Sequence, residues 1–237
     1  MINPKWRHEY KYFSPELLLD ELEKRCSVIL QKDRNVGEQG FYHIRSIYFD
    51  DMYNTCYYEN ENGTDPREKF RVRIYNNSDS RISLELKQRK MGKCHKLSCL
   101  LPRARLDALI NFDFHNPCLL PKEDDSYIYK KFYAQILSRN LHPVNIVCYD
   151  RVPFVNRIGN VRITFDRNIR SADDFKNFFS GSLATRPILP DGTNLLEVKF
   201  DELLPDYIYD VLSSEKIKQT SFSKYYLCRK FNMKSTL

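Results

Sequence analysis

Basic and acidic residues alternate with apolar residues along five short stretches of this chain. Side chains on a β-strand point alternately to opposite faces, so each stretch would carry its polar residues on one face. If the strands lie side by side, these faces form a field rich in arginine and lysine that also holds a few carboxylates. Such a field suits a polyphosphate together with a divalent cation. The polar members are Arg7, Glu9 and Lys11; Arg71 and Arg73; Glu85, Lys87 and Arg89; Arg162, Thr164 and Asp166; and Glu197, Lys199 and Asp201.

A simpler interpretation is a half-buried sheet whose charged face lies in water, with surface ion pairs of little energetic value. Alternation alone does not say which face is wet. The composition of the faces favours binding, because Arg71 and Arg73 lie two residues apart and arginine is suited to bidentate phosphate contacts. For Glu9 and Arg89 the surface ion pair remains a strong alternative.

Length and composition favour one ordered domain with an anionic partner. The 237 residues include 16 Tyr and 15 Phe but only 7 Gly, and no obvious linker divides them. We therefore expect a single domain over residues 1–237. The formal net charge of +7 favours a nucleotide, an inorganic phosphate chain, a nucleic acid or a membrane surface.

The cysteine pattern favours free thiols and a cytoplasmic location. Seven cysteines at irregular spacing form no CxxC motif, and an odd count argues against a disulfide framework. Cys94, His95 and Cys99 lack a second pair at zinc spacing. We see no secretory signal and no apolar run near the ~20 residues of a membrane span.

The periodicity predicts strands that alternate with a few amphipathic helices. The short polar joint between 76 and 80 indicates an antiparallel hairpin. Ser14 followed by Pro15 indicates a helix start, with Ser14 as the cap. The expected strands are 5–13, 42–50, 68–76, 81–90, 95–101, 144–154, 160–168 and 194–201, and the expected helices are 15–30, 102–112, 127–139, 204–215 and one that begins near Ser221 to Ser223.

Common nucleotide and hydrolase motifs are absent from the sequence. There is no Walker A loop, no GxGxxG after a strand, no GxSxG and no HExxH. Phosphates would therefore be held by side chains, through several converging Arg and Lys residues. At least one carboxylate would be needed for Mg²⁺ or Mn²⁺, which prefer oxygen ligands.

Eight motifs in the same order resemble the VTC domain, the polyphosphate polymerase domain of the triphosphate tunnel metalloenzyme (CYTH-like) superfamily. The resemblance covers nearly the whole chain. The motifs are RHEYKY at 7–12, SIYFDD at 46–51, KFRVRIY at 69–75, LELKQRK at 84–90, YDRVPF at 149–154, VRITFDRNI at 161–169, LLEVKF at 195–200 and SFSKYY at 221–226.

The resemblance implies an α+β fold: a closed antiparallel β-barrel, or triphosphate tunnel, with a polar charged interior and helices packed outside. It also implies an enzyme that builds polyphosphate from ATP, releases ADP and uses Mn²⁺ or Mg²⁺. Its partners would be ATP, inorganic polyphosphate and a membrane protein that handles polyphosphate, so that a cytoplasmic chain would lie peripheral to a membrane. Nucleic acid is not an expected partner, because an exposed basic stripe with stacking aromatics is not evident.

Site residues follow from the matching motifs. Lys87, Arg162, Lys199 and Lys224 are the expected catalytic residues. Glu197 is the expected metal ligand, with Glu9 and Glu85 as further candidates. The expected phosphate-binding residues are Arg7, Lys11, Arg71, Arg73, Lys87, Arg89, Arg151, Arg162, Lys199, Ser223 and Lys224.

One departure from the wider superfamily separates the possible activities. Related triphosphatases and cyclases open with ExExK, whereas this chain has Arg7, Glu9 and Lys11 at those positions. The missing first Glu favours the polymerase branch over a triphosphatase or cyclase of the same fold. A non-catalytic polyphosphate sensor is a further alternative, but the presence of Glu197 argues against it.

Overall fold

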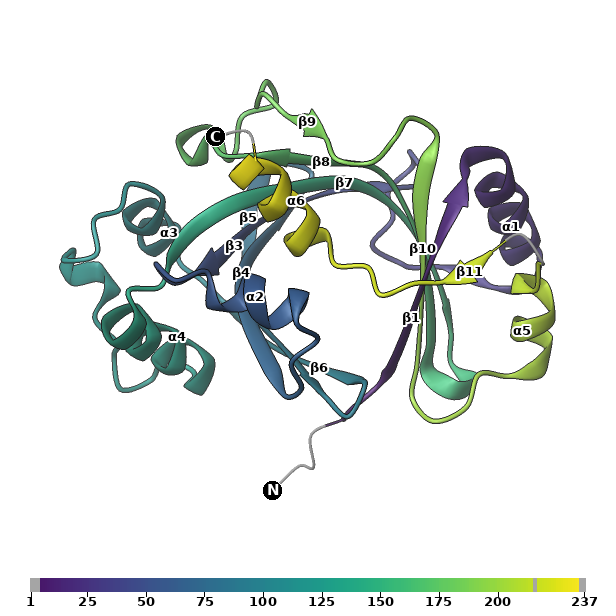
Figure 1. Cartoon of the computed structure of the whole chain (residues 1–237), viewed down its shortest axis with the longest axis horizontal. Helices are drawn as coiled ribbons and strands as arrows, with labels where there is room; N and C mark the ends of the chain where they lie inside the picture. Colours follow the sequence, from purple (N-terminus) through teal and green to yellow (C-terminus); the bar gives the residue numbers. More distant parts are fainter. Residues whose placement is uncertain (1–4, 215–216, 235–237) are drawn as a thin grey trace.

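A single, strongly twisted antiparallel sheet organises the protein in a computed structural model that describes residues 5–214 and 217–234 (Figure 1). The hydrogen-bonded order of the main path is β11-β1-β10-β8-β7-β3-β4-β5-β6, with β2 beside β7 and β9 beside β8. The strands are β1 His8–Pro15, β2 Gln31–Lys32, β3 Tyr42–Asp50, β4 Arg67–Tyr75, β5 Ser78–Lys90, β6 Lys93–Leu100, β7 His142–Asn156, β8 Val161–Ala172, β9 Arg186–Pro187, β10 Thr193–Phe200 and β11 Lys218–Gln219.

The sheet does not close, so the predicted β-barrel is wrong. A closed barrel needs a continuous hydrogen-bonded ladder between its first and last strands. Here β1 pairs with β11 at Tyr12 and Phe13, and it meets β6 only through an isolated bridge between Arg7 and Cys94. The α+β part of the expectation holds, with six α-helices in the described ranges.

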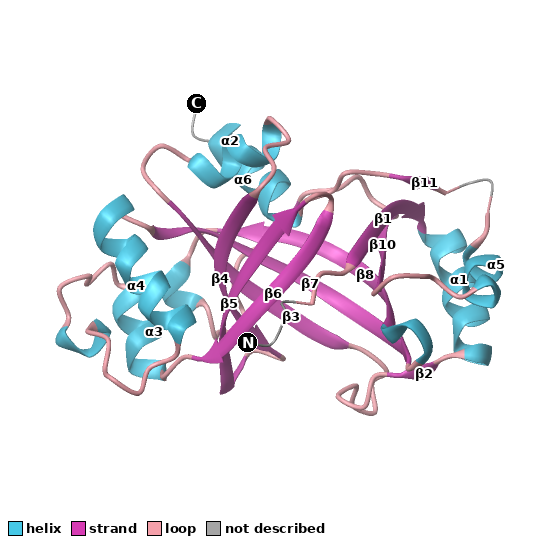
Figure 2. Cartoon of the chain, turned by 90° about the horizontal axis from the view of Figure 1, so that it is seen from below, coloured by secondary structure: helices cyan, strands magenta, loops and turns pink. Residues whose placement is uncertain are grey.

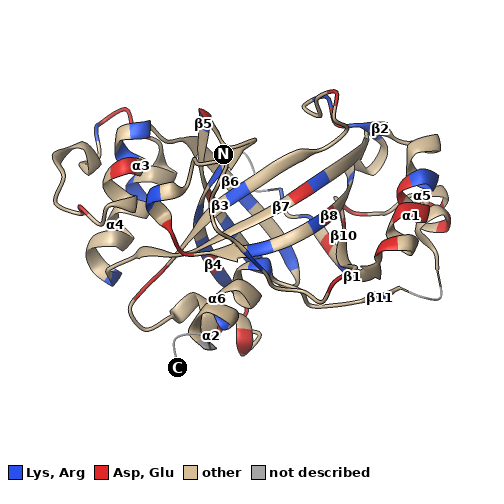
Figure 3. Cartoon of the chain, turned by 90° about the horizontal axis from the view of Figure 1, so that it is seen from above, with Lys and Arg blue, Asp and Glu red and all other residues tan. Residues whose placement is uncertain are grey.

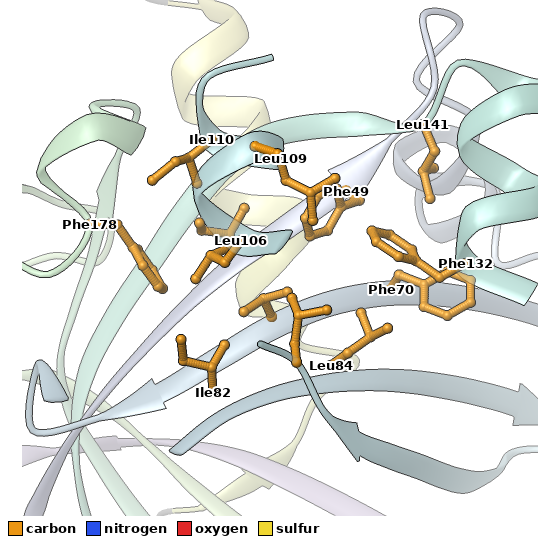
Figure 4. Close-up of a cluster of buried hydrophobic side chains, with 14 of the residues drawn as sticks. Phe49, Phe70, Ile82, Leu84, Leu106, Leu109, Ile110, Phe132, Leu141 and Phe178 are labelled. Carbon is orange, nitrogen blue, oxygen red and sulfur yellow. The ribbon is translucent and has the colours of Figure 1, made fainter. Parts of the chain in front are cut away.

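Helices cover the apolar face of the sheet at two ends, as the sequence predicts (Figure 2). At one end α3 and α4 pack on β3, β4 and β5, where Phe132 lies against Phe49 and Phe70 (Figure 4). At the other end α1 and α5 pack on β8 and β10. Each fully buried Phe or Leu stabilises the fold by about 1.5–3 kcal/mol. The helices are α1 Glu16–Ile29, α2 Thr55–Glu61, α3 Arg103–Ile110, α4 Tyr127–Arg139, α5 Asp206–Leu212 and α6 Lys224–Lys234, with 3₁₀ turns at Pro117–Leu119, Ile158–Asn160 and Phe175–Asn177. The predicted helix at 204–215 is therefore shorter, and its position 215 lies outside the described residues.

The opposite face of the sheet is partly covered by the C-terminal segment. After β11 the chain crosses to α6, the yellow helix in Figure 1. There Phe222, Tyr225 and Cys228 pack against a cluster that includes Tyr48 and Tyr149. This cover places the start of α6 over the polar faces of the strands.

The predicted hairpin forms, and its turn explains its register. β4 and β5 are joined by Asn76 and Asn77, which both have positive φ angles, of 50° and 56°. Two left-handed residues suit a two-residue hairpin, and Asn tolerates that conformation. The predicted Ser14 cap is wrong, because β1 continues to an extended Pro15 and α1 begins at Glu16 without a side-chain cap.

The sequence analysis missed α2, although the signal was present at the end of β3. The Asp50 carboxylate accepts hydrogen bonds from the amides of Cys56 and Tyr57, and that of Asp51 accepts one from Thr55. Carboxylates at a helix N-terminus satisfy its free amides and its dipole. The consecutive aspartates therefore start α2, which forms part of the wall of the cavity described below.

Candidate phosphate-binding site

Two cavities of about 320 and 700 Å³ lie against the polar faces of the strands. Their walls share Glu9, Arg71, Arg73, Lys87, Cys94, Arg151 and Lys199. The smaller cavity, called the inner cavity here, is also bounded by α2, the turn after it and the start of α6. Ten Lys or Arg residues and six Asp or Glu residues line it, so its wall is cationic. Figure 3 shows the corresponding blue positions on neighbouring strands.

All the site residues expected from the sequence line one or both cavities, and their catalytic, phosphate-binding and metal-binding roles stay predictions. Arg7, Glu85 and Arg162 line only the outer, larger cavity, and Glu197 lines only the inner one. Those that line the inner cavity are Glu9, Lys11, Arg71, Arg73, Lys87, Arg89, Arg151, Glu197, Lys199, Ser223 and Lys224.

Glu9 and Glu197 form the acidic centre of the inner cavity, on the neighbouring strands β1 and β10. Glu9 is the cross-strand partner of Lys199, and Glu197 is that of Lys11. The Lys199 ammonium pairs closely with Glu197 and lies 3.7 Å from Glu9. Lys87, from β5, lies 2.8 Å from Glu9. Residues from both ends of the sheet therefore meet here.

The cations hold both carboxylates in their ionised form. Burial raises the pKa of Glu9, but Lys11, Lys87 and Lys199 outweigh burial and lower it well below its usual value. The pKa of Glu197 is lowered in the same way, chiefly by Lys199, although Glu9 opposes this. Burial lowers the pKa of Lys199 to about 8, even though Glu197 and Glu9 raise it.

Arg71 and Arg73 are fixed in the wall by Glu85 and two tyrosines. Arg71 donates from Nε to Glu85 Oε2 at 2.7 Å and from Nη1 to the Tyr48 hydroxyl at 2.8 Å. Arg73 donates to the Tyr149 hydroxyl at 3.0 Å. Glu85 is thus surrounded by Arg71, Arg73 and Lys96, which lower its pKa well below the usual value although burial opposes them. This pairing makes Glu85 a positioning group for the arginines.

A second buried carboxylate, Asp166, holds Arg151 and Lys224. Asp166 is fully buried and accepts two hydrogen bonds from Arg151, at 2.6 and 2.7 Å. The Lys224 ammonium lies 2.6 Å from Asp166 Oδ2 and 4.7 Å from the centre of the Tyr149 ring. Burial raises the pKa of Asp166, but Arg151 and Lys224 outweigh it and lower this pKa. Asp166 therefore connects the start of α6 to β7 and β8.

Ser223 begins α6 beside the cavity. Its Oγ accepts a hydrogen bond from the amide of Tyr226 at 3.3 Å, as expected of a helix cap. Lys11 donates to the carbonyl oxygen of Phe222 at 2.8 Å, so β1 and the segment before α6 are joined. Ser223 therefore caps α6, the helix that the sequence predicts to begin near Ser221 to Ser223.

In the outer cavity, Arg7 and Arg162 are paired with other groups. Arg7 Nε lies 3.1 Å from Asp201 Oδ1. Arg162 pairs with Asp33 and donates to the Tyr42 hydroxyl at 2.9 Å. Arg162 is the cross-strand partner of Lys199, two residues from Glu197 along β10, but both arginines pair with acids other than Glu197.

The acidic groups suit a metal that arrives with phosphates. Within residues 5–214 and 217–234, no three His, Cys, Asp or Glu side chains gather closely enough to bind a metal by themselves. The wall does contain Glu9 and Glu197, and the buried Thr164 hydroxyl opposite Glu197 has no hydrogen-bond partner among the described residues. Mg²⁺ is commonly held by one or two carboxylates with water and substrate phosphates, so this oxygen donor set fits.

Sequence reasoning gave no site role to Tyr48, Lys69, Tyr149 and Asp166, although it placed Asp166 on the polar face of its strand. Lys69 and Asp166 lie on the same alternating faces as Arg71 and Arg162, which was a usable signal. The tyrosines gave no such signal, because aromatic residues on a strand equally indicate packing.

The fold and the cavity define an α+β protein with a buried cationic site built from distant strands. The chain belongs to the VTC domain family, whose model matches residues 6–232. The resemblance inferred from the sequence is therefore confirmed. A comparison with curated proteins finds no match.

Three solved structures illustrate the wider similarity. A putative adenylyl cyclase from Hippeastrum, HpAC1, described as having a dominant triphosphatase activity, has a TM-score of 0.56 and 11% identity over 96% of each chain, which shows a shared fold. A putative adenylate cyclase from Bacillus halodurans has a TM-score of 0.48 and 11% identity over 86% of each chain. The PH1819 protein from Pyrococcus horikoshii OT3 has a TM-score of 0.47 and 14% identity, over 95% of this chain and 99% of that one. In the described ranges of the present chain, no helix is both long and apolar enough to cross a bilayer.

Proposed function

We propose that this chain is a metal-dependent polyphosphate polymerase that transfers the γ-phosphoryl group of ATP to the end of an inorganic polyphosphate chain. Residues 1–237 would act as one VTC-type domain. The observation that carries the proposal is the gathering of Arg71, Arg73, Arg151 and Lys87 around one cavity that also contains Glu197. Membership of the VTC domain family supports the same assignment.

The arrangement suits phosphoryl transfer, which asks a protein mainly for positioning and charge neutralisation. Arg71 and Arg73 are held by Glu85 and the tyrosines, so their guanidinium groups are fixed before a phosphate arrives. Lys224 is held in the same way by Asp166. Fixed donors of this kind lose little freedom when they bind a charged group.

The metal, Mn²⁺ or Mg²⁺, would be held by Glu197, with Glu9 beside it, and would neutralise phosphate charge when bound. Glu197 remains ionised because Lys199 and neighbouring cations outweigh its burial. The Lys199 ammonium pairs with Glu197 and lies 3.7 Å from Glu9. When the metal occupies Glu197, this ammonium would turn towards phosphate oxygens and remain near Glu9. No protein nucleophile is required, because a terminal phosphate oxygen of the acceptor is already anionic.

The remaining phosphate contacts are assigned by position. Lys11, Lys87, Arg89, Arg151 and Lys199 would contact phosphates in the inner cavity. The proposal assigns Arg7 and Arg162 to phosphates in the outer cavity, since they line only that one. Glu85 would act on the arginines and not on the metal, because Arg71, Arg73 and Lys96 surround it. A cytoplasmic location and a membrane-protein partner that handles polyphosphate belong to this proposal and rest on the family alone.

Identification of products tests the proposal. Pure protein is incubated with ATP and Mn²⁺, and nucleotides, orthophosphate, diphosphate and polymer are separated. Long-chain polyphosphate with ADP supports the polymerase. Orthophosphate with diphosphate, or a cyclic nucleotide, would instead assign the triphosphatase or cyclase chemistry. Binding of polyphosphate without any product would identify a sensor.

A further inference from the structure

Lys69 is a cation of the inner cavity that the sequence motifs leave without a role. It lies on β4, two residues before Arg71, and lines the inner cavity. Its ammonium donates to Ser223 Oγ at 3.2 Å and lies 4.9 Å from the centre of the Tyr225 ring and 5.7 Å from that of Tyr48. The side chain is therefore held in place by β3 and by the start of α6.

The charge of Lys69 lacks a carboxylate, unlike most of its neighbours. Arg71 pairs with Glu85, Lys87 with Glu9, and Lys224 with Asp166. Among the described residues Lys69 forms no ion pair with an acid. Lys69 is half-buried, and a charge partly withdrawn from water without a partner is costly, so a site with a surplus cation favours an anion.

The sheet register makes this surplus larger. Lys69 is the cross-strand partner of Lys87, and the next inward-facing pair on the same two strands is Arg67 with Arg89. Like charges directly opposite each other destabilise a sheet. Glu9 compensates Lys87, so Lys69 with the neighbouring Arg67 and Arg89 pair supplies the surplus charge that an anion would neutralise.

Burial and neighbouring cations make Lys69 lose its proton more readily than a lysine in water, although the amine is still mostly protonated at pH 7. Burial, together with Lys87 and Lys11, lowers the pKa of Lys69 to about 8, although Tyr48 and Cys56 raise it. The groups that face it are Tyr48 on β3, Lys87 on β5, Lys11 on β1, Cys56 on α2, and Ser223 with Tyr225 at the start of α6. A phosphate oxygen at the ammonium would add the missing negative charge and raise its pKa.

We propose that Lys69 binds a phosphate group of the substrate when that group enters the inner cavity. This inference rests on the proposed phosphate-binding function of that cavity. Ser223 and the two tyrosine rings act as positioning groups, since they hold the ammonium without neutralising its charge. Lys69 thereby extends the row formed by Arg71 and Arg73 towards the start of α6.

The inference is tested by the affinity of Lys69→Met for inorganic tripolyphosphate, measured by calorimetry in metal-free buffer at pH 7. This measurement needs no turnover. Methionine keeps the apolar stem between the rings and removes the charge. We expect about tenfold weaker binding, which corresponds to about 1.4 kcal/mol. Lys130→Met is the matched control: Lys130 is exposed on α4 and contacts only the Glu123 carbonyl oxygen among the described residues, so we expect unchanged binding.

Lys69→Arg separates charge from packing. At pH 7 this variant should bind tripolyphosphate within threefold of the wild type. At pH 9 it should bind more tightly than the wild type, because arginine keeps the charge that Lys69 loses above about pH 8. Heats measured at pH 8 in two buffers of different ionisation enthalpy should show proton uptake that is smaller in Lys69→Met.

The outcomes distinguish this inference from the proposed function. Two results would overturn the role of Lys69, whatever the enzyme produces. One is tripolyphosphate binding to Lys69→Met that is less than threefold weaker than to the wild type. The other is a Lys69→Arg variant whose affinity equals that of the wild type at both pH 7 and pH 9. Weakened binding in Lys69→Met without any polymer from ATP would retain that role and reject the polymerase.

Discussion

Asp166→Asn should strongly destabilise the protein, because Asp166 balances two buried cations. Its carboxylate is fully buried, accepts two hydrogen bonds from Arg151 and lies 2.6 Å from the Lys224 ammonium. Asparagine keeps the shape but leaves both cations without that charge. Removal of one partner from a buried ion pair costs about 3–5 kcal/mol. Because Glu197 lies 4.0 Å from Arg151 and supplies part of the missing charge, we expect the lower half of this range.

The free energy of unfolding in urea at pH 7 measures this effect directly. A loss of about 3 kcal/mol should lower Tm by about 6–12 °C for a chain of this size. Asp79→Asn is the matched control: the same substitution removes an ion pair whose side chains are 58% and 45% exposed, which contributes about 1 kcal/mol or less. Tripolyphosphate should raise the Tm of Asp166→Asn more than that of the wild type, because it restores negative charge to the cations.

The pH dependence supplies a further test of the same argument. The pKa of Asp166 is lowered in the folded protein, so its contribution is present above the unfolded value of about 3.9 and is lost as pH falls through the folded value. The difference between wild type and variant should therefore shrink under acid conditions. A loss below 1 kcal/mol at pH 7, or one equal to that of Asp79→Asn, would refute the reasoning.

Three further predictions concern activity in the inner cavity. Glu197→Gln should remove turnover with Mn²⁺ or Mg²⁺ while the Tm stays within a few degrees, because Glu9 remains to neutralise Lys199; metal-dependent rates equal to wild type would reject Glu197 as the ligand. Lys224→Ala should lower kcat by roughly tenfold or more, about 1.4 kcal/mol of barrier, and unchanged kinetics would exclude it from the reaction. The value of kcat/KM should fall as the pH rises through about 8, because Lys69 and Lys199 lose their protons there in the free protein, and a kcat/KM that rises from pH 7 to pH 9 would contradict their cationic roles.

The sequence was sufficient to predict the eight longer strands and the faces that they present, but not the two-residue strands β2, β9 and β11. Arg71, Lys87 and Glu197 are distant in the chain, yet alternation alone placed each on a polar face, and the register brings those faces together. The position of α4 was also predictable, because its apolar stripe at helical spacing matches the buried side of the helix.

The shape of the sheet was not predictable in the same way. Alternation gives the face of each side chain but says nothing about which strands form the edges. The two-residue strand β11 takes hydrogen bonds of β1, and only Arg7 and Cys94 bridge to β6. These contacts depend on tertiary packing, which the sequence pattern does not show. The closed barrel was inferred from the family resemblance instead, and it is wrong.

The pairing of charges within the site also lay beyond the sequence. Whether a lysine is neutralised depends on which carboxylate reaches it, as Lys224 with Asp166 and Lys69 without an acid illustrate. Neighbours in space, and not in sequence, fix those pairs. The same limit explains why the sequence did not show that Arg162, opposite Lys199 on the neighbouring strand, pairs with Asp33 and lines only the outer cavity.

The stoichiometry of ADP and polymer tests the central claim most directly. Pure protein receives ATP, Mn²⁺ and a short polyphosphate acceptor, and ADP, free orthophosphate and phosphate in polymer are measured in the same sample. The proposed reaction predicts one ADP for each phosphate added to polymer, with little free orthophosphate. ADP matched by orthophosphate without growth of the chain, or no consumption of ATP by folded protein, would contradict it.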